Sequence, residues 1–285
     1  MAHLQSPSVL IVGAGSVGLV TGYYLSLAGA QVTYLVRPKR AEVLKRTQFL
    51  YSFDKNHLHE FKSYSYLTSP STILSSTYDY ILVTLDGKSV QSEEGETLVK
   101  IIGQAARDKT TKKSDVAYMD NIGNGFILDD YVPSISSSFS ELYNACGVSN
   151  CVVWSPAQSA LTIFPLFAVF IGLELLGWPK TEDIDTESEV WKLTTAAAKE
   201  IQTLDICGEA GTQAALATTE STFVQMSAYL DEKLRPLDYH AFNRYHHGGK
   251  VIEQDRMHIE RCISQGVTEG KPMSALKTLL QRINH

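Results

Sequence analysis

The stretch Val9-Leu10-Ile11-Val12-Gly13-Ala14-Gly15-Ser16-Val17-Gly18 decides the fold of the first half of this chain. An apolar run typical of a buried strand leads into a GxGxxG loop, helical periodicity follows over residues 19–27, and a second strand is predicted at 31–36. In such a βαβ unit Gly13 permits the tight turn, Gly15 lets a pyrophosphate approach the backbone, and Gly18 lets helix and strand pack closely. The pattern predicts a dinucleotide site to which Ser16 and Val17 contribute at the helix N-terminus. The alternative is a glycine turn that binds no nucleotide.

The residue that follows the second strand indicates which dinucleotide fits. A fold that prefers NAD usually carries Asp or Glu there, about 20 residues past the loop, to bond the ribose 2′-hydroxyl. This chain carries Arg37, then Pro38, Lys39 and Arg40, and the first carboxylate after them is Glu42. Because a guanidinium grips a phosphate with a planar fork, the cluster predicts NADPH, with Arg37 and Lys39 at the 2′-phosphate. The alternative is a solvated basic start of a helix.

Length and composition favour a soluble enzyme of two domains. The chain has 285 residues and a formal net charge of −6, which argues against a nucleic-acid surface. Its four cysteines show no CxxC spacing and no associated histidine cluster, so no metal site is predicted. With no secretory signal at the N-terminus, we expect a cytoplasmic protein with reduced thiols.

The first half of the chain keeps the rhythm of a nucleotide-binding fold. The run Tyr80–Leu85 predicts a strand buried in a parallel sheet, residues 89–107 a crossover helix, and residues 116–119 the next strand. Because ligands bind at the carboxyl edge of such a sheet, Thr84–Asp86, with Thr84 and Leu85 as the candidate site residues, and Asn121–Asn124 are expected to border the cofactor, and the second group also to reach the substrate. The segment Ser134–Ser140 is interpreted as a serine-rich loop.

From about residue 160 onward the pattern is helical. Residues 160–178 are almost wholly apolar, which predicts a buried helix and a homodimer core; a membrane span is the alternative, opposed by Pro165 and Glu174. Further helices are predicted at 187–204, 218–234, 252–264 (ended by Gly266) and 275–283. The fold class is therefore α/β, a Rossmann-type doubly wound parallel sheet in a domain spanning 1–155, followed by an all-helical domain spanning 156–285 that contributes to substrate binding and dimerisation.

Both ends of the chain resemble the ketopantoate reductase family. The resemblance rests on the glycine loop, the strand end Leu35-Val36-Arg37 and the run Tyr80–Leu85. In the tail, Gly249-Lys250-Val251-Ile252-Glu253-Gln254-Asp255 is similar to the family's G-[RK]-x-T-E-I-D segment, and Gly266-Val267 with Pro272 to its G-V-P-x-P turn. The resemblance implies an oxidoreductase in which NADPH delivers hydride to a small 2-keto acid or related carbonyl, and a subunit that dimerises through its helical domain.

The resemblance also implies two site residues. Asp120-Asn121 falls where the family has Q-N-G, so Asn121 is the candidate for the asparagine beside cofactor and substrate, with Asn124 as an alternative register. Glu253 matches the tail glutamate that lies at the substrate; the alternative is an ordinary carboxylate in the first turn of a helix.

Three positions depart from the family pattern. Asp86 stands where several members carry a lysine, His240-Ala241 replaces a serine pair, and residues 160–178 contain no lysine or arginine to serve as the catalytic lysine.

A substitute proton donor is therefore sought before the matched glutamate. Tyr245, His246, His247 and Lys250 are the candidates, and a solvated turn is the alternative for the histidine pair. The predicted function is an NADPH-dependent reductase of a small ketone, keto acid or imine. The alternative is a non-redox or regulatory protein that uses the nucleotide fold as a metabolite-binding scaffold.

Overall fold

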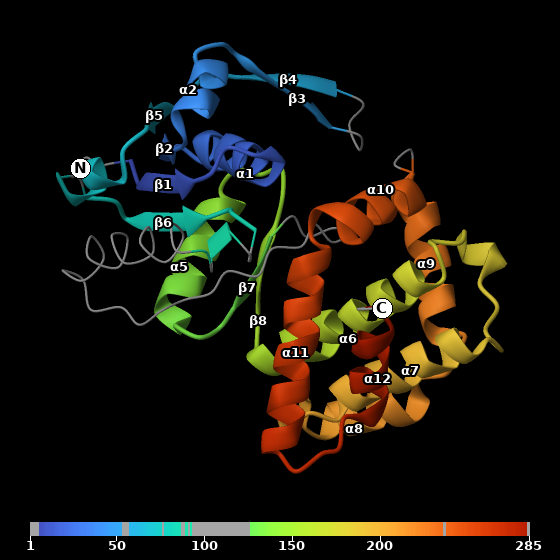
Figure 1. Ribbon diagram of the computed structural model, residues 1–285. Coiled ribbons are helices and arrows are strands. Elements are labelled where there is room, and N and C mark those ends of the chain that lie inside the picture. The colour runs from blue at the N-terminus through green and yellow to red at the C-terminus, as the bar shows by residue number, and fades with distance from the viewer. Residues whose placement is uncertain are drawn as a thin grey trace. The chain divides into compact units, whose positions relative to one another are not determined.

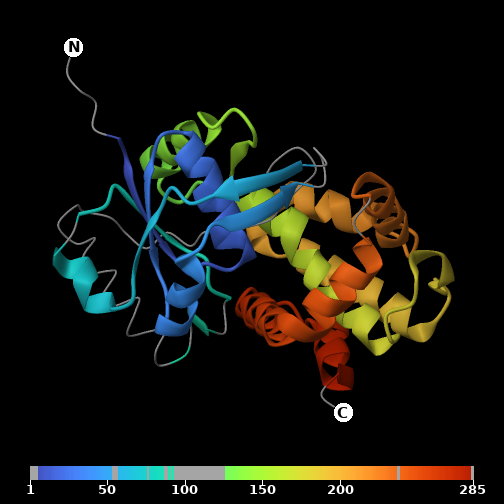
Figure 2. The same ribbon diagram turned by 90° about the horizontal axis from the view of Figure 1, so that it is seen from above.

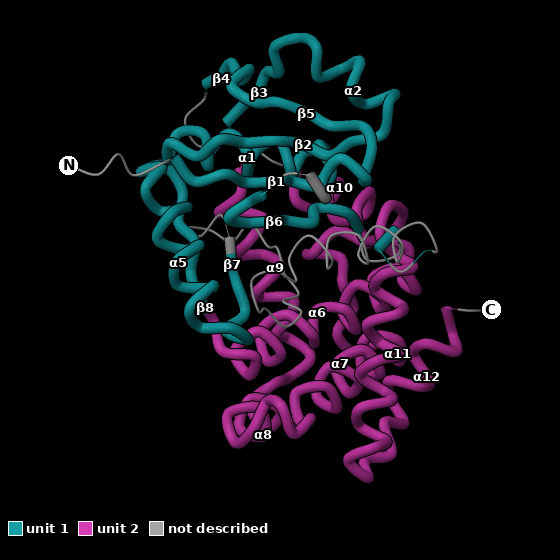
Figure 3. The backbone as a smooth tube through the Cα atoms, turned by 90° about the vertical axis from the view of Figure 1, so that its left-hand side faces the viewer, with its two compact units in different colours: residues 1–153 teal, residues 154–285 magenta. Residues whose placement is uncertain are grey.

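The computed structural model describes residues 6–52, 57–75, 77–86, 89–90, 92, 126–235 and 238–283. The chain divides into two compact units, residues 1–153 and residues 154–285, which Figure 3 shows in different colours. Each unit has its own hydrophobic core, so each is described by itself.

Unit 1 contains a parallel four-stranded sheet in the order β5-β2-β1-β6. The strands and helices that build it are β1 (Ser8–Val12), α1 (Ser16–Leu27), β2 (Gln31–Leu35), α2 (Pro38–Leu44), β5 (Ser65–Leu67), a 3₁₀ turn (Pro70–Ser75) and β6 (Tyr80–Val83). Val9 pairs with Val32 on one side and with Tyr80 on the other, so β1 lies inside the sheet. The predicted βαβ unit and the strand at residue 80 are confirmed, although only Leu82 of β6 is fully buried.

Close packing between α1 and the sheet depends on two glycines of that helix (Figure 1). A Cβ on Gly18 would lie 2.3 Å from the carbonyl oxygen of Gly13, and a Cβ on Gly22 would meet the hydroxyl of Tyr34. That hydroxyl is fully buried and donates a hydrogen bond to the Gly18 carbonyl oxygen at 2.9 Å. Helix and strand therefore approach more closely than any residue with a side chain would allow.

Two further pieces complete unit 1. An antiparallel hairpin joins β3 (Gln48–Ser52) to β4 (His57–Phe61), and a two-stranded sheet joins β7 (Phe126–Asp129) to β8 (Cys151–Trp154) around the helix α5 (Pro133–Asn144).

Helix α5 corrects the interpretation of Ser134–Ser140 as a loop. Pro133 occupies the first turn, Phe139 and Tyr143 point into the core, and Ser136 donates to the carbonyl oxygen of Asp129 at 3.0 Å. A helical stripe of two aromatic residues overrides the weak helix propensity of serine.

Unit 2 is helical. Figures 1 and 2 show its elements, which are α6 (Pro156–Leu175), α7 (Glu189–Gln202), α8 (Gly208–Ala217), α9 (Thr222–Lys233), α10 (Tyr239–Tyr245), a π-helical turn (His246–Lys250), α11 (Ile252–Thr268) and α12 (Ser274–Ile283), with 3₁₀ turns at Thr181–Asp183 and Asp205–Cys207. The fold class predicted from the sequence, a parallel α/β sheet followed by a helical region, is confirmed.

Helix α6 forms the centre of unit 2. Ser155 and Gln158 close a capping box at its start, and Gly172 leaves room for Thr194 of α7, whose hydroxyl would lie 2.1 Å from an added Cβ. Its apolar side chains pack against the core of unit 2 itself. By length and composition α6 could also cross a membrane, but core helices of soluble proteins pass the same test.

Helix α11 continues through the position where its end was predicted. Gly266 lies inside the helix. A Cβ at this position would lie 2.4 Å from the Met273 sulfur, so the glycine lets the next segment pack closely against α11. The reversal occurs at Gly270, whose φ of +77° is in the left-handed region.

Candidate functional site

The glycine loop of unit 1 lies at the carboxyl ends of three neighbouring strands. The Gly13 amide donates to the Leu35 carbonyl oxygen at the end of β2, at 3.0 Å, and the Thr84 amide donates to Val12 at the end of β1, at 2.9 Å. Gly13 has a φ of +101°, which a residue with a side chain adopts only with strain. The tight turn predicted at this glycine is therefore present.

Gly15 differs from its neighbours because it faces open space. It is exposed, its φ of −76° is available to any residue, and no atom lies within 4 Å of an added Cβ. It immediately precedes α1, whose N-terminus has no side-chain cap and no acidic residue in the first turn, and Ser16 is exposed beside it while Val17 is half-buried. The uncapped amides of this turn are an environment that favours an anion.

Thr84 and Leu85, which are predicted to border the cofactor, lie against the loop. The Thr84 hydroxyl donates to the carbonyl oxygens of Val12 and Gly13 at 3.0 and 3.2 Å, and the Leu85 side chain is 3.2 Å from the Cβ position of Gly13. These contacts fix the turn from the β6 side.

The basic cluster after β2 contains one anchored cation. Arg40 is half-buried, and its Nε donates to the Ala14 carbonyl oxygen of the glycine loop at 2.8 Å. Arg37 and Lys39 are exposed at the start of α2. Arg40 is therefore the cation that the fold holds beside the loop, while its terminal nitrogens stay available for an anion.

Several predicted residues lie outside the described part of the chain or have an ordinary environment. Asn121, its alternative Asn124 and the predicted strand 116–119 fall outside the described residues, as does most of the crossover helix 89–107. Asp86, which replaces a family lysine, accepts hydrogen bonds from the Ser89 amide and hydroxyl at 2.8 and 2.7 Å. It therefore holds the start of the next helical turn.

Glu253 lies in the first turn of α11, half-exposed. It accepts a hydrogen bond from Arg256 at 3.1 Å, one helical turn further on. This contact leaves the second carboxylate oxygen free to accept a hydrogen bond from a ligand, but it is also an ordinary surface ion pair of a helix.

The four proposed proton donors divide into an inner and an outer pair. His247 stacks on Phe170 of α6, with ring centroids 3.5 Å apart, and its Nδ1 donates to the Asp255 carboxylate at 2.8 Å. Asp255 is fully buried, and among the described residues its second oxygen has no partner. Burial raises the pKa of Asp255, against the opposing effect of its hydrogen bond with His247. His247 and Asp255 therefore form a buried structural pair, and His247 does not lie in a solvated turn.

His246 is also turned inward. Its ring stacks on Phe242, and burial, with the neighbouring His247 and Lys250, lowers its pKa to about 4. At neutral pH this imidazole is uncharged and has no proton to spare as an acid. The structure therefore separates His246 from the role considered for it.

Gly248 presses the same turn against the end of α6. An added Cβ would lie 2.6 Å from Trp178 Nε1, and that indole donates to the Glu174 carboxylate. Trp178 itself has a φ of +57°, and its carbonyl oxygen accepts a hydrogen bond from His240 Nε2 at 2.7 Å. His247 and Gly248 thus fix the π-turn to α6 through one ring stack and one close backbone approach.

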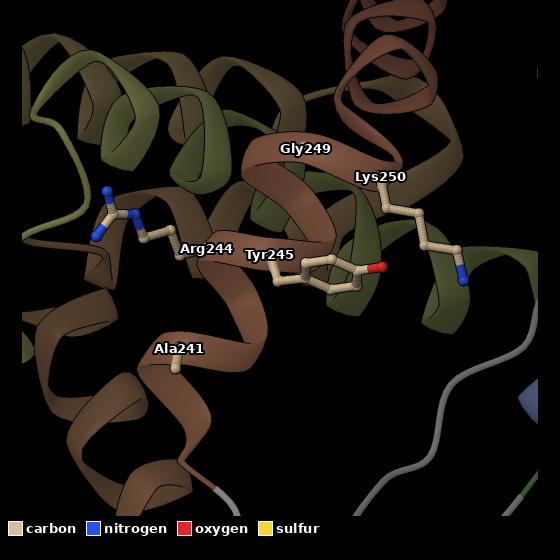
Figure 4. Close-up of a pocket in the computed structure, with 5 residues that line it drawn as sticks. All are labelled: Ala241, Arg244, Tyr245, Gly249 and Lys250. Atoms are coloured by element: carbon tan, nitrogen blue, oxygen red, sulfur yellow. The ribbon is translucent and has the colours of Figure 1, made fainter.

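Tyr245 and Lys250 face outward from this turn. Both are exposed, and Figure 4 shows the hydroxyl of Tyr245 and the ammonium of Lys250 projecting to the same side, with Arg244 pointing the other way. They line a shallow, open depression of about 580 Å³, together with Ala241, Arg244 and Gly249. No carboxylate is among its lining residues.

Sequence reasoning missed the contacts that connect distant segments. The anchoring of Arg40 on Ala14 joins residues 26 positions apart, and the stack of His247 on Phe170 joins α6 to the π-turn. The adjacent glycines at 248–249 were the available signal for an unusual turn, because glycine permits close backbone approach.

Comparisons with known proteins agree with this architecture. Residues 9–107 match the family model of ketopantoate reductase PanE/ApbA. A search of curated proteins found no match. A solved 2-dehydropantoate 2-reductase from Geobacter metallireducens is 16% identical with a TM-score of 0.61, and the similarity covers 97% of this chain and 99% of that one.

Two further solved structures share the fold. The 2-dehydropantoate 2-reductase from Methylococcus capsulatus has a TM-score of 0.62 at 14% identity, covering 97% of this chain and 96% of that one. A D-mandelate dehydrogenase solved with NADH and anilino(oxo)acetate has a TM-score of 0.59 at 10% identity, covering 97% of each chain. The glycine loop and β6 lie inside the region that matches the ketopantoate reductase family model, and the fold is shared with these solved structures over nearly the whole length of the chain.

Proposed function

We propose that this protein is an NADPH-dependent reductase of a small carbonyl compound, a keto acid or a related ketone or imine. The observation that carries the proposal is the glycine loop, where an open Gly15, an uncapped helix N-terminus and an anchored guanidinium lie together. This is an arrangement for a phosphorylated ligand. The D-mandelate dehydrogenase with NADH supports a nicotinamide cofactor for the fold.

The preference for NADPH over NADH rests on the cations. Arg37 and Lys39 flank the end of β2 and Arg40 reaches back to the loop, and no carboxylate occurs between residues 37 and 41. A carboxylate at the end of β2 would bond a 2′-hydroxyl, whereas cations there stabilise a 2′-phosphate. The proposed cofactor residues are therefore Gly13, Gly15, Ser16, Val17, Gly18, Arg37, Lys39, Arg40, Thr84, Leu85 and Asn121.

The carbonyl chemistry is assigned through the family. Bound NADPH would supply the hydride, and the residues proposed beside the substrate are Asn121, as a hydrogen-bond donor, and Glu253. Reduction also requires a proton at the developing alkoxide. Helix α6 carries no lysine or arginine, so a positively charged proton donor must come from another segment of the chain. His247 stacks on Phe170 of this helix.

The test of cofactor choice is a titration of both nucleotides into wild type, Arg37→Ala and Arg40→Ala. Wild type is expected to bind NADPH about tenfold to a hundredfold more tightly than NADH, the worth of one charge-assisted contact. Each variant is expected to lose affinity for NADPH while its affinity for NADH changes little. Equal affinities in wild type, or an unchanged ratio in both variants, would remove the assignment.

The test of the loop is Gly15→Val. Because the position has a negative φ and open space, the variant is expected to fold as wild type does, while its side chain fills the approach to the backbone. A folded Gly15→Val protein should show no NADPH-dependent rise in Tm. Wild-type affinity in this variant would mean that the loop serves the fold alone.

Redox chemistry is tested with NADPH and a panel of hydrophobic and acidic carbonyls. Cofactor binding with no oxidation of NADPH by any of them would favour the alternative, a metabolite-binding scaffold.

We further propose a cytoplasmic homodimer that forms through the helical unit and binds neither nucleic acid nor membranes. Light scattering on detergent-free protein tests the dimer, and a monomer would contradict it.

A further inference from the structure

We propose that the β3–β4 hairpin of unit 1 binds a divalent transition-metal ion of the Cu²⁺ and Ni²⁺ class through the imidazoles of His57 and His59. Cysteine spacing predicts no metal site in this chain, and these ligands are two histidines of one strand instead. Neither histidine belongs to the segments that resemble the ketopantoate reductase family or to the proposed cofactor residues. The inference therefore does not depend on the proposed function.

Both histidines project from the same face of β4 (Figure 1). Residues two apart on a strand point to one side of it, and on this side Leu50 and Phe61 pack into the core of unit 1. Burial increases along the strand, from the exposed His57 through the half-buried His59 to the buried Phe61. The pair lies at the rim of the buried face, where an ion reaches it from solvent while one ligand is held by the core.

The spacing of the two imidazole rings fits a shared ion. Their centroids lie 4.7 Å apart with an angle of 68° between the ring planes, so the rings are not stacked face to face. With metal–nitrogen bonds of about 2.0–2.1 Å, an ion lies about 3.2 Å from each centroid, and the two bonds then meet at about 95°. Square-planar and octahedral ions have neighbouring ligands at about 90°, whereas a tetrahedral ion requires about 110°. The ring torsion of an exposed histidine is soft, so His57 turns its nitrogen toward this point at little cost.

The hydroxyl of Tyr23 on α1 orients the half-buried ring. It lies 3.0 Å from His59 Nδ1, and the Tyr23 ring packs edge-on against Phe61 with centroids 5.6 Å apart. When Nδ1 donates its proton to this hydroxyl oxygen, the lone pair of Nε2 remains for a metal ion. Metal-bound histidines commonly donate their second ring N–H to such a partner, which fixes the tautomer and the ring orientation. His59 is thus the preorganised ligand and His57 the adaptable one.

The ligands select the class of ion. Neutral imidazoles suit Cu²⁺, Ni²⁺ and Zn²⁺, whereas Mg²⁺ and Ca²⁺ prefer oxygen ligands. In the described part of the chain, no third His, Cys, Asp or Glu joins the pair, so water completes the coordination. An open site with two nitrogens at about 95° is expected to follow the Irving–Williams order and to bind Cu²⁺ most tightly.

The experiment is a calorimetric titration of the metal-free full chain with Cu²⁺, Ni²⁺, Zn²⁺ and Mg²⁺. We expect Cu²⁺ to bind at least about tenfold more tightly than Ni²⁺ or Zn²⁺, and Mg²⁺ to give no binding heat. Ni²⁺, which does not oxidise thiols, is the second probe. The electron paramagnetic resonance spectrum of bound Cu²⁺ should show coupling to two imidazole nitrogens.

Four variants locate the binding. His57→Ala and His59→Ala should each weaken Cu²⁺ and Ni²⁺ binding at least about tenfold, because a single imidazole loses the advantage of two linked ligands. Tyr23→Phe should weaken it about tenfold while the spectrum still shows two nitrogens, because the ligands remain and only their orientation is lost. The matched control is His3→Ala, which removes a histidine outside the hairpin and should bind both ions as wild type does.

Three results would overturn the inference. These are the absence of Cu²⁺ and Ni²⁺ binding to wild type, wild-type affinity in His57→Ala, and loss of the binding in His3→Ala. Because His57 is exposed, its variant is expected to fold as wild type does, which circular dichroism checks. Unchanged Cu²⁺ affinity in Tyr23→Phe would contradict the positioning role of that hydroxyl. The metal titrations contain no nucleotide, so their outcome is separate from that of the NADPH titrations.

Discussion

The glycine loop of unit 1 is built from one continuous stretch of backbone, whereas the π-turn of unit 2 is held by side chains from two helices and from the segment that follows α6. In the loop, the positions of Gly13 and Gly18 are fixed by backbone contacts, and the exposed Gly15 is left free. The turn is held by Phe170 of α6, by Asp255 of α11 and by Trp178 of the segment that follows α6. The comparison shows that a site built from local backbone can be recognised from a sequence motif, whereas a site held by distant side chains can be recognised only from the tertiary contacts.

The largest expected effect breaks the loop from within. Gly18→Ala places a Cβ at 2.3 Å from the Gly13 carbonyl oxygen, a backbone atom that cannot move aside without opening the turn. We expect the free energy of unfolding of unit 1 to fall by roughly 3–4 kcal/mol. Circular dichroism in urea measures it, with Gly15→Val as the control that stays within about 0.5 kcal/mol of wild type.

The tryptophans sharpen that measurement. Trp178 and Trp191 lie within unit 2, whereas Trp154 ends β8, which pairs with β7 of unit 1, so most of the tryptophan fluorescence follows unit 2. If circular dichroism gives Gly18→Ala the same free energy of unfolding as wild type, helix α1 does not approach the loop as closely as the structure indicates.

The second effect breaks the inner face of the π-turn. His247→Phe keeps a ring to stack on Phe170 but leaves the buried Asp255 carboxylate without its donor. Removing one partner of a buried pair is expected to lower the free energy of unfolding by roughly 2–4 kcal/mol. Urea unfolding followed by tryptophan fluorescence is the measurement.

A double variant serves as the control for this pair. His247→Phe with Asp255→Leu removes both polar partners and should recover part of the loss. A single His247→Phe variant as stable as wild type would show that the pair does not hold the turn.

The third effect concerns pH. His258 stacks on Phe167, and burial, with a smaller contribution from Arg261, lowers its pKa to about 4. The unfolded chain protonates this histidine near pH 6.5, before the folded chain does, so stability is lost as the pH falls from about 6.5 to 4. The lowered pKa of His246 has the same effect on stability. The raised pKa of Asp255 has the opposite effect, because it lowers the stability as the pH rises above the ordinary carboxyl value.

His258→Phe isolates this contribution. The variant keeps the stack and removes the titration, so the acid-induced loss of stability over that window should shrink by about 2 kcal/mol relative to wild type. Urea unfolding at pH 7 and at pH 4.5 measures the difference. An identical pH dependence in both proteins would contradict the assignment.

The smallest effect lies away from both sites and calibrates them. The Glu200 carboxylate of α7 accepts from the amides of Ala275 and Leu276, at 3.1 and 2.9 Å, and so caps α12 from another helix. Glu200→Ala is expected to cost about 1–2 kcal/mol, the usual worth of a cap. A fluorescence-detected urea curve for this variant sets the scale on which His247→Phe is judged; a larger loss here than there would reverse the ranking of the two contacts.

The sequence by itself determined the βαβ unit, the parallel strand at residue 80, the helical second half and the roles of Gly13 and Gly18 in the turn. Each of these depends on residues close in the chain or on a periodicity that local backbone geometry imposes. Prediction failed where a distant contact outweighed the local pattern. The serine-rich segment forms α5 because Phe139 and Tyr143 reach a core, and Gly266 is an interior residue of α11 that leaves room for Met273 rather than the end of the helix.

Only the tertiary structure decided which of the candidate side chains face inward and which are exposed. Tyr245, His246, His247 and Lys250 are equivalent in the sequence, since nothing local distinguishes a buried imidazole from an exposed one. Phe170 of α6 and Asp255 hold His247, Phe242 stacks on His246, Tyr245 and Lys250 stay exposed, and Ala14 holds Arg40 but not Arg37. The physical reason is that burial and anchoring are set by partners far along the chain, which no short pattern records.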